Sequence, residues 1–315
     1  MIAWTDRHCR HFHRALSRHA RLYTEMITTG ALIHGPRERL LAFDPVEHPV
    51  AIQLGGCDPA DLARCARMAE RAGYDEINLN CGCPSERVQR GSFGACLMAE
   101  PALVADCVRA MRDAVSVPVT VKHRIGLDRS EDYGFVRDFV GELARAGCEV
   151  FIAHARNAWL KGLNPKENRD IPPLRYEVVR RLACDFPDRR FVLNGGIRSH
   201  DEALRLLDEP GPGALAGVML GREAYGNPWM LAEVDTLYFG QAPAVSSREP
   251  VVDAMRNYVL REAAAGTEPR AIVRHMLGLF NGLPGARRWR RMLSDTAALA
   301  REGERIIDTA LETLN

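Results

Sequence analysis

Residues 71–85 read Arg-Ala-Gly-Tyr-Asp-Glu-Ile-Asn-Leu-Asn-Cys-Gly-Cys-Pro-Ser, and this stretch decides the fold. Gly73 is expected to end a helix, and the apolar and polar residues of 77–80 then alternate as in a strand. A glycine and a proline end this strand on either side of Cys83. A buried free cysteine before a turn and a catalytic thiol both fit this segment taken alone.

The same step from helix to strand recurs at Arg145-Ala-Gly-Cys-Glu149, which indicates one βα unit used repeatedly. Short β-rich segments alternate with amphipathic helices, the pattern of a parallel sheet with crossover helices. Strands are expected at 22–27, 50–54, 76–80, 118–122, 150–154, 190–194 and 217–220. Because the chain opens almost directly on a helix at about 5–17, the pattern predicts a (β/α)8 TIM barrel whose first strand is missing.

Local signals place helix starts and a domain boundary. Asp58-Pro59 supplies an N-cap and a first-turn proline, and Ser199-His-Asp-Glu202 reads as a capping box. The βα alternation stops near 240–243, and 246–250 resembles a linker. We therefore expect a TIM-barrel domain over residues 1–243 and a small helical domain over residues 251–315.

Composition limits the class of protein. At 315 residues and 46% hydrophobic, the chain has room for a barrel and a smaller domain. It has no apolar run long enough to span a membrane and no signal-peptide layout, so no membrane association is expected. Nine cysteines without framework spacing favour a reducing cytoplasm. Cys81-Gly-Cys83 lacks a second Cys/His pair, so no metal is expected.

The charge is unevenly distributed along the chain. The net charge is only +1, but residues 270–294 contain six arginines and one histidine without any acidic residue. A solvated helical face is the plain interpretation of a charge run, although such faces usually mix both signs. A stretch of one sign is better suited to contact with phosphates.

In a TIM barrel the catalytic groups come from the C-terminal ends of different strands. Here nearly every predicted strand ends in a hydrogen-bonding or ionisable side chain. These residues are Glu25, Gln53, Asn80 with Cys83, Lys122 with Arg124, His154 with Arg156, Asn194 and Arg222. A barrel without a function has little reason to place them so regularly, and the sequence therefore predicts an active site at this end.

Glycines follow the last two predicted strands, at Gly195-Gly196 and at Gly221. Glycines at these two places allow backbone N–H groups to approach a phosphate closely. Arg222 can add a charge-assisted contact. The pattern favours a phosphate-bearing cofactor or substrate over plain turns.

Lys122 leaves three interpretations open: a Schiff-base lysine, an electrostatic partner of an electron-rich ring, or a lysine at the barrel rim. Gln53, His154 and Asn194 are expected around it, so that donors from several strands converge on one planar, anionic group. A reduced flavin is such a group, and charge near its ring tunes its electronics.

Ordered motifs run along essentially the whole chain. They are Trp4-Thr-Asp-Arg-His, Leu22-Tyr-Thr-Glu-Met, Ala51-Ile-Gln-Leu, Asn78-Leu-Asn-Cys-Gly-Cys-Pro-Ser, Gly91-Ser-Phe-Gly-Ala-Cys-Leu-Met, Val119-Thr-Val-Lys-His-Arg-Ile-Gly, His154-Ala-Arg, Asn168-Arg-Asp-Ile-Pro-Pro-Leu, Asn194-Gly-Gly-Ile, Val218-Met-Leu-Gly-Arg and Arg274-His-Met-Leu-Gly-Leu-Phe. Taken together they resemble the tRNA-dihydrouridine synthases, in particular the A-type subfamily.

The resemblance implies an FMN-containing barrel with a helical tRNA-binding domain. Such an enzyme reduces uridine in the D-loop of tRNA to 5,6-dihydrouridine at the expense of NADPH. By match of motif, Cys83 is the catalytic proton donor and Asn80 contacts the substrate tRNA. The FMN-binding residues are Gln53, Lys122, His154, Asn194, Gly195, Gly196, Gly221 and Arg222, and further tRNA contacts come from Lys166, Arg169, Arg287 and Arg290.

The implied chemistry agrees with the residue types. Saturating the C5=C6 bond of uracil needs a hydride at one carbon and a proton at the other. An ordinary thiol, with a pKa of about 8.5, is mostly protonated at pH 7 and can donate that proton. The target base must also leave its stack to reach the barrel mouth.

One departure from the family concerns the start of the chain. Family members carry a first strand ending in Ala-Pro-Met-Met-Asp or similar just before the match to Trp4-Thr-Asp-Arg-His, and here Met1-Ile-Ala stands at that end. The start is either assigned too late, which is our hypothesis, or truly truncated. The rival functions are an FMN barrel acting on a free pyrimidine and a tRNA-binding protein without activity. A monomer is expected.

Overall fold

A computed structural model describes residues 4–209 and 213–314 of the chain. The chain divides into two compact units. The sheet unit comprises Met26–Ala42 and Val50–Leu220, and the helical unit comprises Met1–Glu25, Phe43–Pro49 and Gly221–Asn315. The division expected from the sequence, into residues 1–243 and 251–315, stays a prediction.

Within the described residues one sheet of seven strands is present, in the order in which the strands follow in the chain. The strands are β1 (Leu22–Thr28), β2 (Val50–Gly55), β3 (Glu76–Cys81), β4 (Val119–Arg124), β5 (Val150–His154), β6 (Arg190–Asn194) and β7 (Gly217–Met219). Strands β2 to β7 pair in parallel. This sequential parallel order confirms the expected (β/α) barrel class. The expected missing strand concerns residues 1–3 and whatever precedes them, which lie outside the described part.

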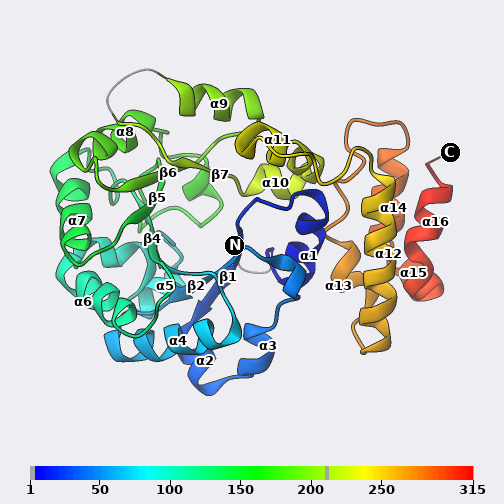
Figure 1. Cartoon of the computed structure of the whole chain (residues 1–315), viewed down its shortest axis with the longest axis horizontal. Coiled ribbons are helices and arrows are strands. Elements are labelled where there is room, and N and C mark those ends of the chain that lie inside the picture. The colour runs from blue at the N-terminus through cyan, green and yellow to red at the C-terminus, as the bar shows by residue number, and fades with distance from the viewer. Residues whose placement is uncertain (1–3, 210–212, 315) are drawn as a thin grey trace. The chain divides into compact units, whose positions relative to one another are not determined.

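Helices connect successive strands, and in the sheet unit they lie outside the strands (Figure 1). They are α2 (Thr29–His34), α3 (Arg37–Leu41), α4 (Pro59–Ala72), α5 (Glu86–Arg90), α6 (Pro101–Arg112), α7 (Tyr133–Arg145), α8 (Tyr176–Asp185) and α9 (His200–Asp208), with the 3-10 turns η2 (Gly94–Ala99) and η3 (Glu167–Arg169). All residues of β2 and β3 are buried, as expected for strands covered on both faces.

The local signals read from the sequence act as expected at most helix ends. Asp58 Oδ1 accepts from Asp61 N at 2.8 Å to start α4. Gly73 and Gly147, which follow α4 and α7, take φ angles of +97° and +91°, a left-handed conformation that favours glycine.

The capping box at Ser199 forms only in part. Ser199 Oγ accepts from Glu202 N at 3.2 Å, as predicted. The Glu202 carboxylate, however, accepts from Arg198 N at 2.8 Å. The carboxylate thus reaches the residue before the N-cap, and the N-cap hydroxyl alone holds the first turn of α9.

The helical unit contains α1 (Arg7–Leu16), η1 (Pro45–Glu47), α10 (Arg222–Gly226), η4 (Pro228–Glu233), α11 (Val234–Phe239), α12 (Glu249–Ala264), α13 (Pro269–Val273), α14 (Ala286–Ser294), α15 (Thr296–Glu302), η5 (Gly303–Arg305) and α16 (Ile306–Glu312). The expected linker at 246–250 ends in α12, which starts at Glu249, and from there on the described residues form helices and turns without strands, as the sequence predicts.

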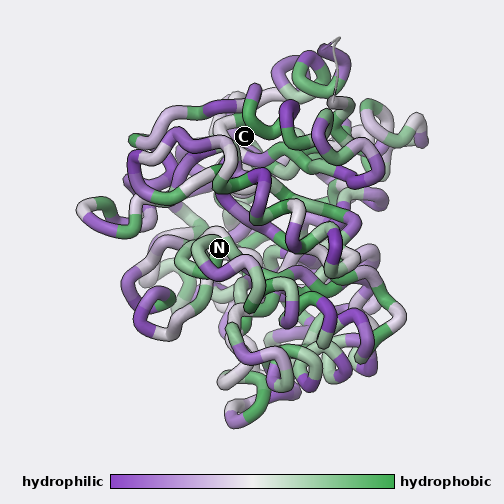
Figure 2. Tube along the Cα trace, turned by 90° about the vertical axis from the view of Figure 1, so that its left-hand side faces the viewer, coloured by the Kyte–Doolittle hydropathy of each residue, from purple (hydrophilic) through white to green (hydrophobic). Residues whose placement is uncertain are grey.

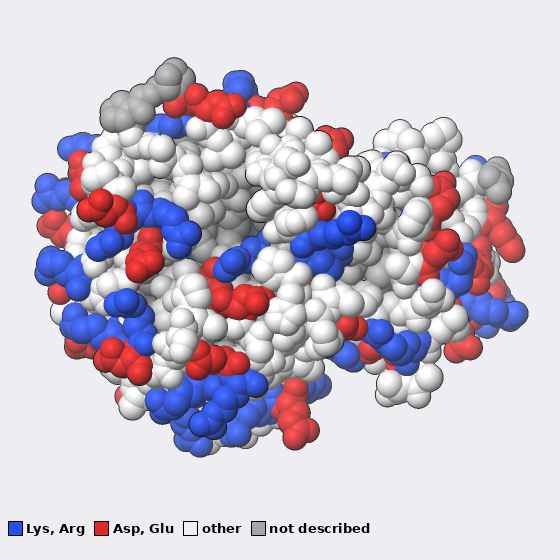
Figure 3. All heavy atoms as spheres, viewed as in Figure 1, with Lys and Arg blue, Asp and Glu red and all other residues white. Residues whose placement is uncertain are grey.

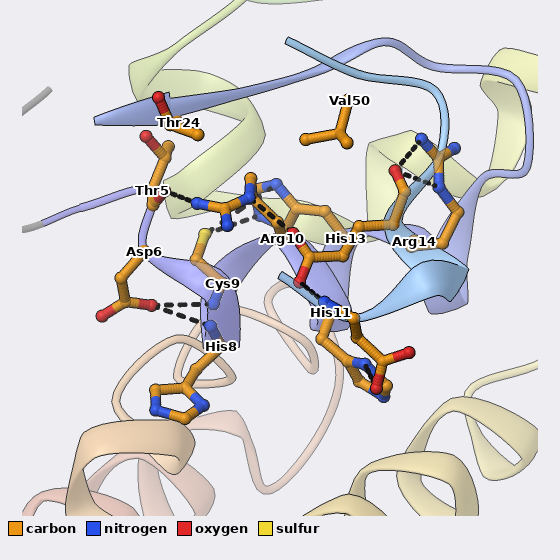
Figure 4. A network of polar contacts seen from close by, with 12 residues as sticks. Thr5, Asp6, His8, Cys9, Arg10, His11, His13, Arg14, Thr24 and Val50 are labelled. Carbon is orange, nitrogen blue, oxygen red and sulfur yellow. Dashed lines mark hydrogen bonds and ion pairs between the residues drawn. The ribbon is translucent and has the colours of Figure 1, made fainter. Parts of the chain in front are cut away.

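A dense polar network surrounds α1 (Figure 4). Asp6 Oδ1 caps the helix by accepting from His8 N and Cys9 N, each at 3.0 Å. The same oxygen lies 3.0 Å from His275 Nε2. Arg10 Nε donates to the fully buried carboxylate of Glu47 at 2.6 Å. The motif at residues 4–8 thereby contacts the motif at 274–280 inside one unit.

The surface mixes polar and charged groups. Hydrophobic and hydrophilic residues alternate along the trace in Figure 2, and Lys or Arg side chains are interspersed with Asp and Glu on the face shown in Figure 3. No helix among the described residues has the length and apolar character needed to cross a membrane.

Candidate active site

The strand register aligns four of the predicted site residues of the sheet unit. Asn80 on β3 is the Cα partner of Lys122 on β4. His154 on β5 is the Cα partner of Asn194 on β6. Adjacent parallel strands therefore present these four side chains at the same C-terminal end of the sheet.

Lys122 and Asn194 contact each other directly. Lys122 Nζ donates to Asn194 Oδ1 at 2.9 Å, and Asn194 Nδ2 donates to Met219 O on β7 at 2.7 Å. Burial and, to a smaller extent, the positive charge of Arg124 lower the pKa of Lys122 to about 7, while Cys83 opposes the shift. The amine can therefore gain or lose its proton near neutral pH, according to what binds beside it.

Cys83 lies in a tightly held turn after β3. Its N–H and that of Gly82 both donate to Asn80 Oδ1, at 3.0 and 3.1 Å. Its carbonyl accepts from Ala95 N at 2.9 Å. The side chain is half-buried, and Sγ lies 3.6 Å from Ser85 Oγ. The backbone of the cysteine is therefore held by hydrogen bonds, and the residue as a whole is not sealed in the core.

A close approach of the backbone explains why residue 94, opposite this turn, is a glycine. Gly94 has a φ of +77°, and a Cβ there would stand 2.6 Å from Cys83 O. Only glycine lets the segment that begins η2 approach the cysteine so closely.

Gln53 and Asn80 are bonded to each other below the turn. Asn80 Nδ2 donates to Gln53 Oε1 at 2.8 Å, and Gln53 Nε2 donates to Asn78 Oδ1 at 2.8 Å. Gln53 is only 3% exposed. An amide nitrogen carries two hydrogens, and the bond to Gln53 uses one of those of Asn80.

The glycines after β6 form a narrow cradle. Gly195 and Gly196 have φ angles of +123° and +74°. A Cβ on Gly195 would lie 2.7 Å from His154 Cδ2, and one on Gly196 would lie 2.4 Å from Leu174 Cδ1. Tyr176 donates its hydroxyl to Gly195 O at 2.6 Å. An added Cβ would collide with side chains already packed there, so both positions require glycine.

The other predicted site residues occupy separate places. Lys166 is exposed and precedes η3, whereas Arg169, at the end of η3, is half-buried. In the helical unit, Gly221 is the N-cap of α10 and Arg222 is its exposed first residue. Arg287 and Arg290 are exposed on α14, whose Trp289 and Leu293 are buried.

The sequence matches the family model described as "Dihydrouridine synthase (Dus)" over residues 1–315. The chain belongs to the dihydrouridine synthase family. It is thus an enzyme of this family, and the resemblance to the A type is confirmed by its curated relatives.

Two relatives named "tRNA-dihydrouridine(20/20a) synthase" illustrate this similarity. The protein of Pseudomonas putida is 55% identical over 314 residues, which cover 100% of this chain and 92% of that protein. The protein of Escherichia coli (strain K12) is 56% identical over 313 residues, 99% of this chain and 89% of that protein. Among solved structures, "Morphinone reductase" matches with a TM-score of 0.50 and 15% identity over 79% of this chain and 85% of that one, a likeness of fold alone.

Two residues that organise the site of this dihydrouridine synthase family member were not assigned a role from the sequence. Arg124 is 3% exposed, and its guanidinium donates to Gly82 O, Asn157 O and Asn168 O at 3.0–3.3 Å. Asn168 is fully buried and bonds both the N–H and the carbonyl of Trp159. Both residues lie within the sequence motifs of the family. A motif alone, however, does not distinguish a residue that contacts a ligand from one that anchors a loop.

The buried polar side chains beneath the turn were also missed. Asn78 Nδ2 donates to Thr120 Oγ1 at 2.8 Å, and Thr120 donates to Glu76 Oε1 at 2.7 Å. The signal was the alternation of polar with apolar residues in β3, which places residues 76, 78 and 80 on one face. Within residues 4–209 and 213–314, no group of three or more His, Cys, Asp or Glu is placed to hold a metal ion.

Proposed function

We propose that this member of the dihydrouridine synthase family reduces uridine to 5,6-dihydrouridine in the D-loop of tRNA, with FMN as cofactor and NADPH as reductant. One observation carries the proposal. A half-buried thiol, Cys83, is held at the end of the strand row that also presents Lys122, His154 and Asn194.

The residues at the strand ends fit a flavin. The Gly195-Gly196 backbone takes left-handed φ angles directly after β6, and its N–H groups would suit a phosphate or ribityl group. Lys122 on β4 supplies a cationic donor for an anionic ring, with His154 on the neighbouring strand β5 and Gln53 on β2, beyond β3. Gly221 and Arg222 would add to the phosphate contact. Bound FMN would supply the hydride for one carbon of the uracil double bond.

Cys83 would supply the proton for the other carbon. The residue is half-buried, and the hydrogen bond that its N–H donates to Asn80 Oδ1 fixes the backbone that carries the sulfur. Lys122 and Arg124 both interact electrostatically with Cys83. After proton donation, water would return a proton to the sulfur.

Recognition of tRNA would combine one base contact with several phosphate contacts. The uridine must leave its stack, and the remaining amide hydrogen of Asn80 would contact its edge. Lys166 and Arg169 would contact the tRNA backbone, as would Arg287 and Arg290 in the helical domain proposed for residues 251–315. Such contacts read shape and charge more than sequence.

The decisive experiment incubates the full chain with FMN, NADPH and tRNA that lacks dihydrouridine, and then maps the product by mass spectrometry. We expect dihydrouridine in the D-loop and none when FMN is withheld. Equal turnover of free uridine or orotate would instead indicate an enzyme of small pyrimidines. Binding of tRNA without any flavin absorbance would indicate a binding protein and overturn the proposal.

A further inference from the structure

A continuous hydrogen-bonded chain of side chains runs through the sheet unit to the cysteine turn. Its members lie on β2, β3 and β4, and each is at most 9% exposed. We call this chain the polar relay; it consists of Glu76, Thr120, Asn78, Gln53 and Asn80. Its four internal bonds measure 2.7 to 2.8 Å.

The strand register creates the polar relay. Gln53 and Asn78 are Cα partners across β2 and β3, and Asn78 and Thr120 are Cα partners across β3 and β4. Glu76, Asn78 and Asn80 alternate along β3 and therefore point to one face. A polar ladder thus crosses the buried sheet and climbs toward its C-terminal end.

The carboxylate of Glu76 sets the direction of every bond in this ladder. A carboxylate accepts hydrogen bonds and donates none, so Thr120 must donate its hydroxyl hydrogen to Glu76. The Thr120 oxygen then accepts from the Asn78 amide nitrogen, which leaves the Asn78 oxygen to accept from Gln53. The same alternation continues upward without a break.

The upper end of the ladder requires the same direction. Gln53 Oε1 accepts from Asn80 Nδ2, which turns Asn80 Oδ1 toward the turn. That oxygen accepts from the backbone N–H groups of Gly82 and Cys83. An inverted Asn80 amide would set its NH2 group against two donors and leave buried groups without partners, which is costly. Both ends therefore demand one and the same orientation of each amide.

We propose that Glu76 is a positioning residue for Cys83, acting at the far end of the polar relay by holding in place, through Thr120, Asn78 and Gln53, the Asn80 amide whose oxygen binds the cysteine turn. This inference rests on the proposed function for its catalytic consequence, but its structural part does not. Glu76 need not touch substrate or flavin; it acts through Thr120 and Asn78. Networks of this kind are cooperative, so breaking one lower bond is expected to loosen the turn above.

Thr120 offers a matched pair of substitutions, because it is 1% exposed and lies one bond from Glu76. Thr120→Val keeps the side-chain shape but breaks the polar relay, whereas Thr120→Ser keeps the hydroxyl and loses only a methyl group. We expect Thr120→Val to lower kcat about tenfold with an unchanged KM for tRNA, since a small misplacement of a reacting group is expensive. Thr120→Ser should have a kcat and a KM for tRNA close to those of the wild type.

A second readout needs neither flavin nor tRNA. The rate of Cys83 alkylation by iodoacetamide is followed by peptide mass spectrometry, with half-buried Cys184 on α8 as internal reference. We expect Thr120→Val to speed Cys83 alkylation at least about twofold, because a loosened turn exposes the sulfur more often, and Thr120→Ser to leave it unchanged. Equal alkylation rates and equal kcat in the two variants would overturn the inference.

Glu76→Gln covers the case in which Thr120→Val fails to fold, as judged by circular dichroism. Its amide can either accept from or donate to Thr120, so the ladder loses its set direction. We expect faster Cys83 alkylation and lower kcat; wild-type values of both would count against the inference. If the wild type makes no dihydrouridine, the proposed function fails, and the alkylation rates still decide the role of Glu76.

Discussion

Lys122 Nζ donates to Asn194 Oδ1 at 2.9 Å and so links β4 to β6 past the intervening strand β5. The bond sets the amine against a neutral amide, and burial together with the positive charge of Arg124 lowers its pKa. The amine therefore has a pKa of about 7 in the folded protein, against an ordinary value of 10.5. Burying such a lysine costs folding free energy, and its positive charge suits an anionic ligand.

This lysine makes stability depend on pH. Between pH 7 and 10.5 the unfolded chain binds a proton that folded Lys122 does not bind, so its contribution to the free energy of unfolding rises with pH and is lost as pH falls to 7. Lys122→Met removes that dependence. We expect the variant to exceed the wild type in stability at pH 7 and the gain to shrink by pH 9.5, measured by urea unfolding without flavin. A gain that is constant across this range would contradict the folded pKa; Lys161→Met, at an exposed site, is the control.

The same pKa predicts proton uptake on flavin binding. If Lys122 is charged beside the flavin, binding above pH 7 takes up a proton, and FMN affinity falls as pH rises. Fluorescence titration with FMN at pH 6.5, 7.5 and 8.5 measures this slope. Lys122→Gln should bind more weakly and lose the slope. An affinity of the wild type that does not vary with pH would remove Lys122 from the charged role.

Cys83→Ala tests the proton donor. We expect dihydrouridine formation to fall about a hundredfold or more, the usual contribution of a general acid, while FMN and tRNA binding stay nearly intact. Single-turnover reduction of tRNA, followed by mass spectrometry, measures the loss. Cys184→Ala, a half-buried thiol on α8, is the matched control and should react like the wild type. Unchanged turnover of Cys83→Ala would assign the proton to another group.

Gly195→Ala tests the cradle after β6. With a φ of +123° and His154 Cδ2 only 2.7 Å from the new Cβ, we expect a loss of about 1–3 kcal/mol in stability and weaker FMN binding. Gly217→Ala in β7, where no atom lies within 4 Å of the added Cβ, should stay within about 0.5 kcal/mol of the wild type. Unfolding curves and flavin titration measure both effects. Equal behaviour of the two variants would show that the cradle is not needed.

Arg287→Ala combined with Arg290→Ala tests the proposed tRNA contact of α14. Both arginines are exposed, so we expect the fold to survive while tRNA affinity falls and the salt dependence of log K loses about two units of slope. Arg64→Ala with Arg67→Ala, equally spaced and exposed on α4, is the matched control. Filter binding measures this slope between about 50 and about 300 mM salt, a range that includes physiological salt. Identical slopes for the two double variants would place the contact elsewhere.

Most of the fold could be predicted because its signals are local. The strands at 150–154 and 190–194 were expected with the bounds that β5 and β6 show, since runs of β-branched and apolar residues bounded by turn residues are readable in sequence. Gly73 and Gly147 end helices because only glycine takes their φ without strain. The backbone partner of the Glu202 carboxylate was predicted wrongly, because that partner depends on where the turn before α9 places the N–H of Arg198.

The sequence by itself determined the order of strands and helices, the family, and the residues that meet at the strand ends, because periodicity, caps and motifs are properties of neighbouring residues. Only the tertiary structure decided that Lys122 bonds Asn194 and that Arg124 donates to three backbone carbonyls. It also decided that a chain of hydrogen bonds leads from Glu76 to the Cys83 turn. These contacts join residues on different strands, and their partners are chosen by register and by the need of each buried polar atom for a hydrogen bond. Neither is written in the spacing of residues along the chain.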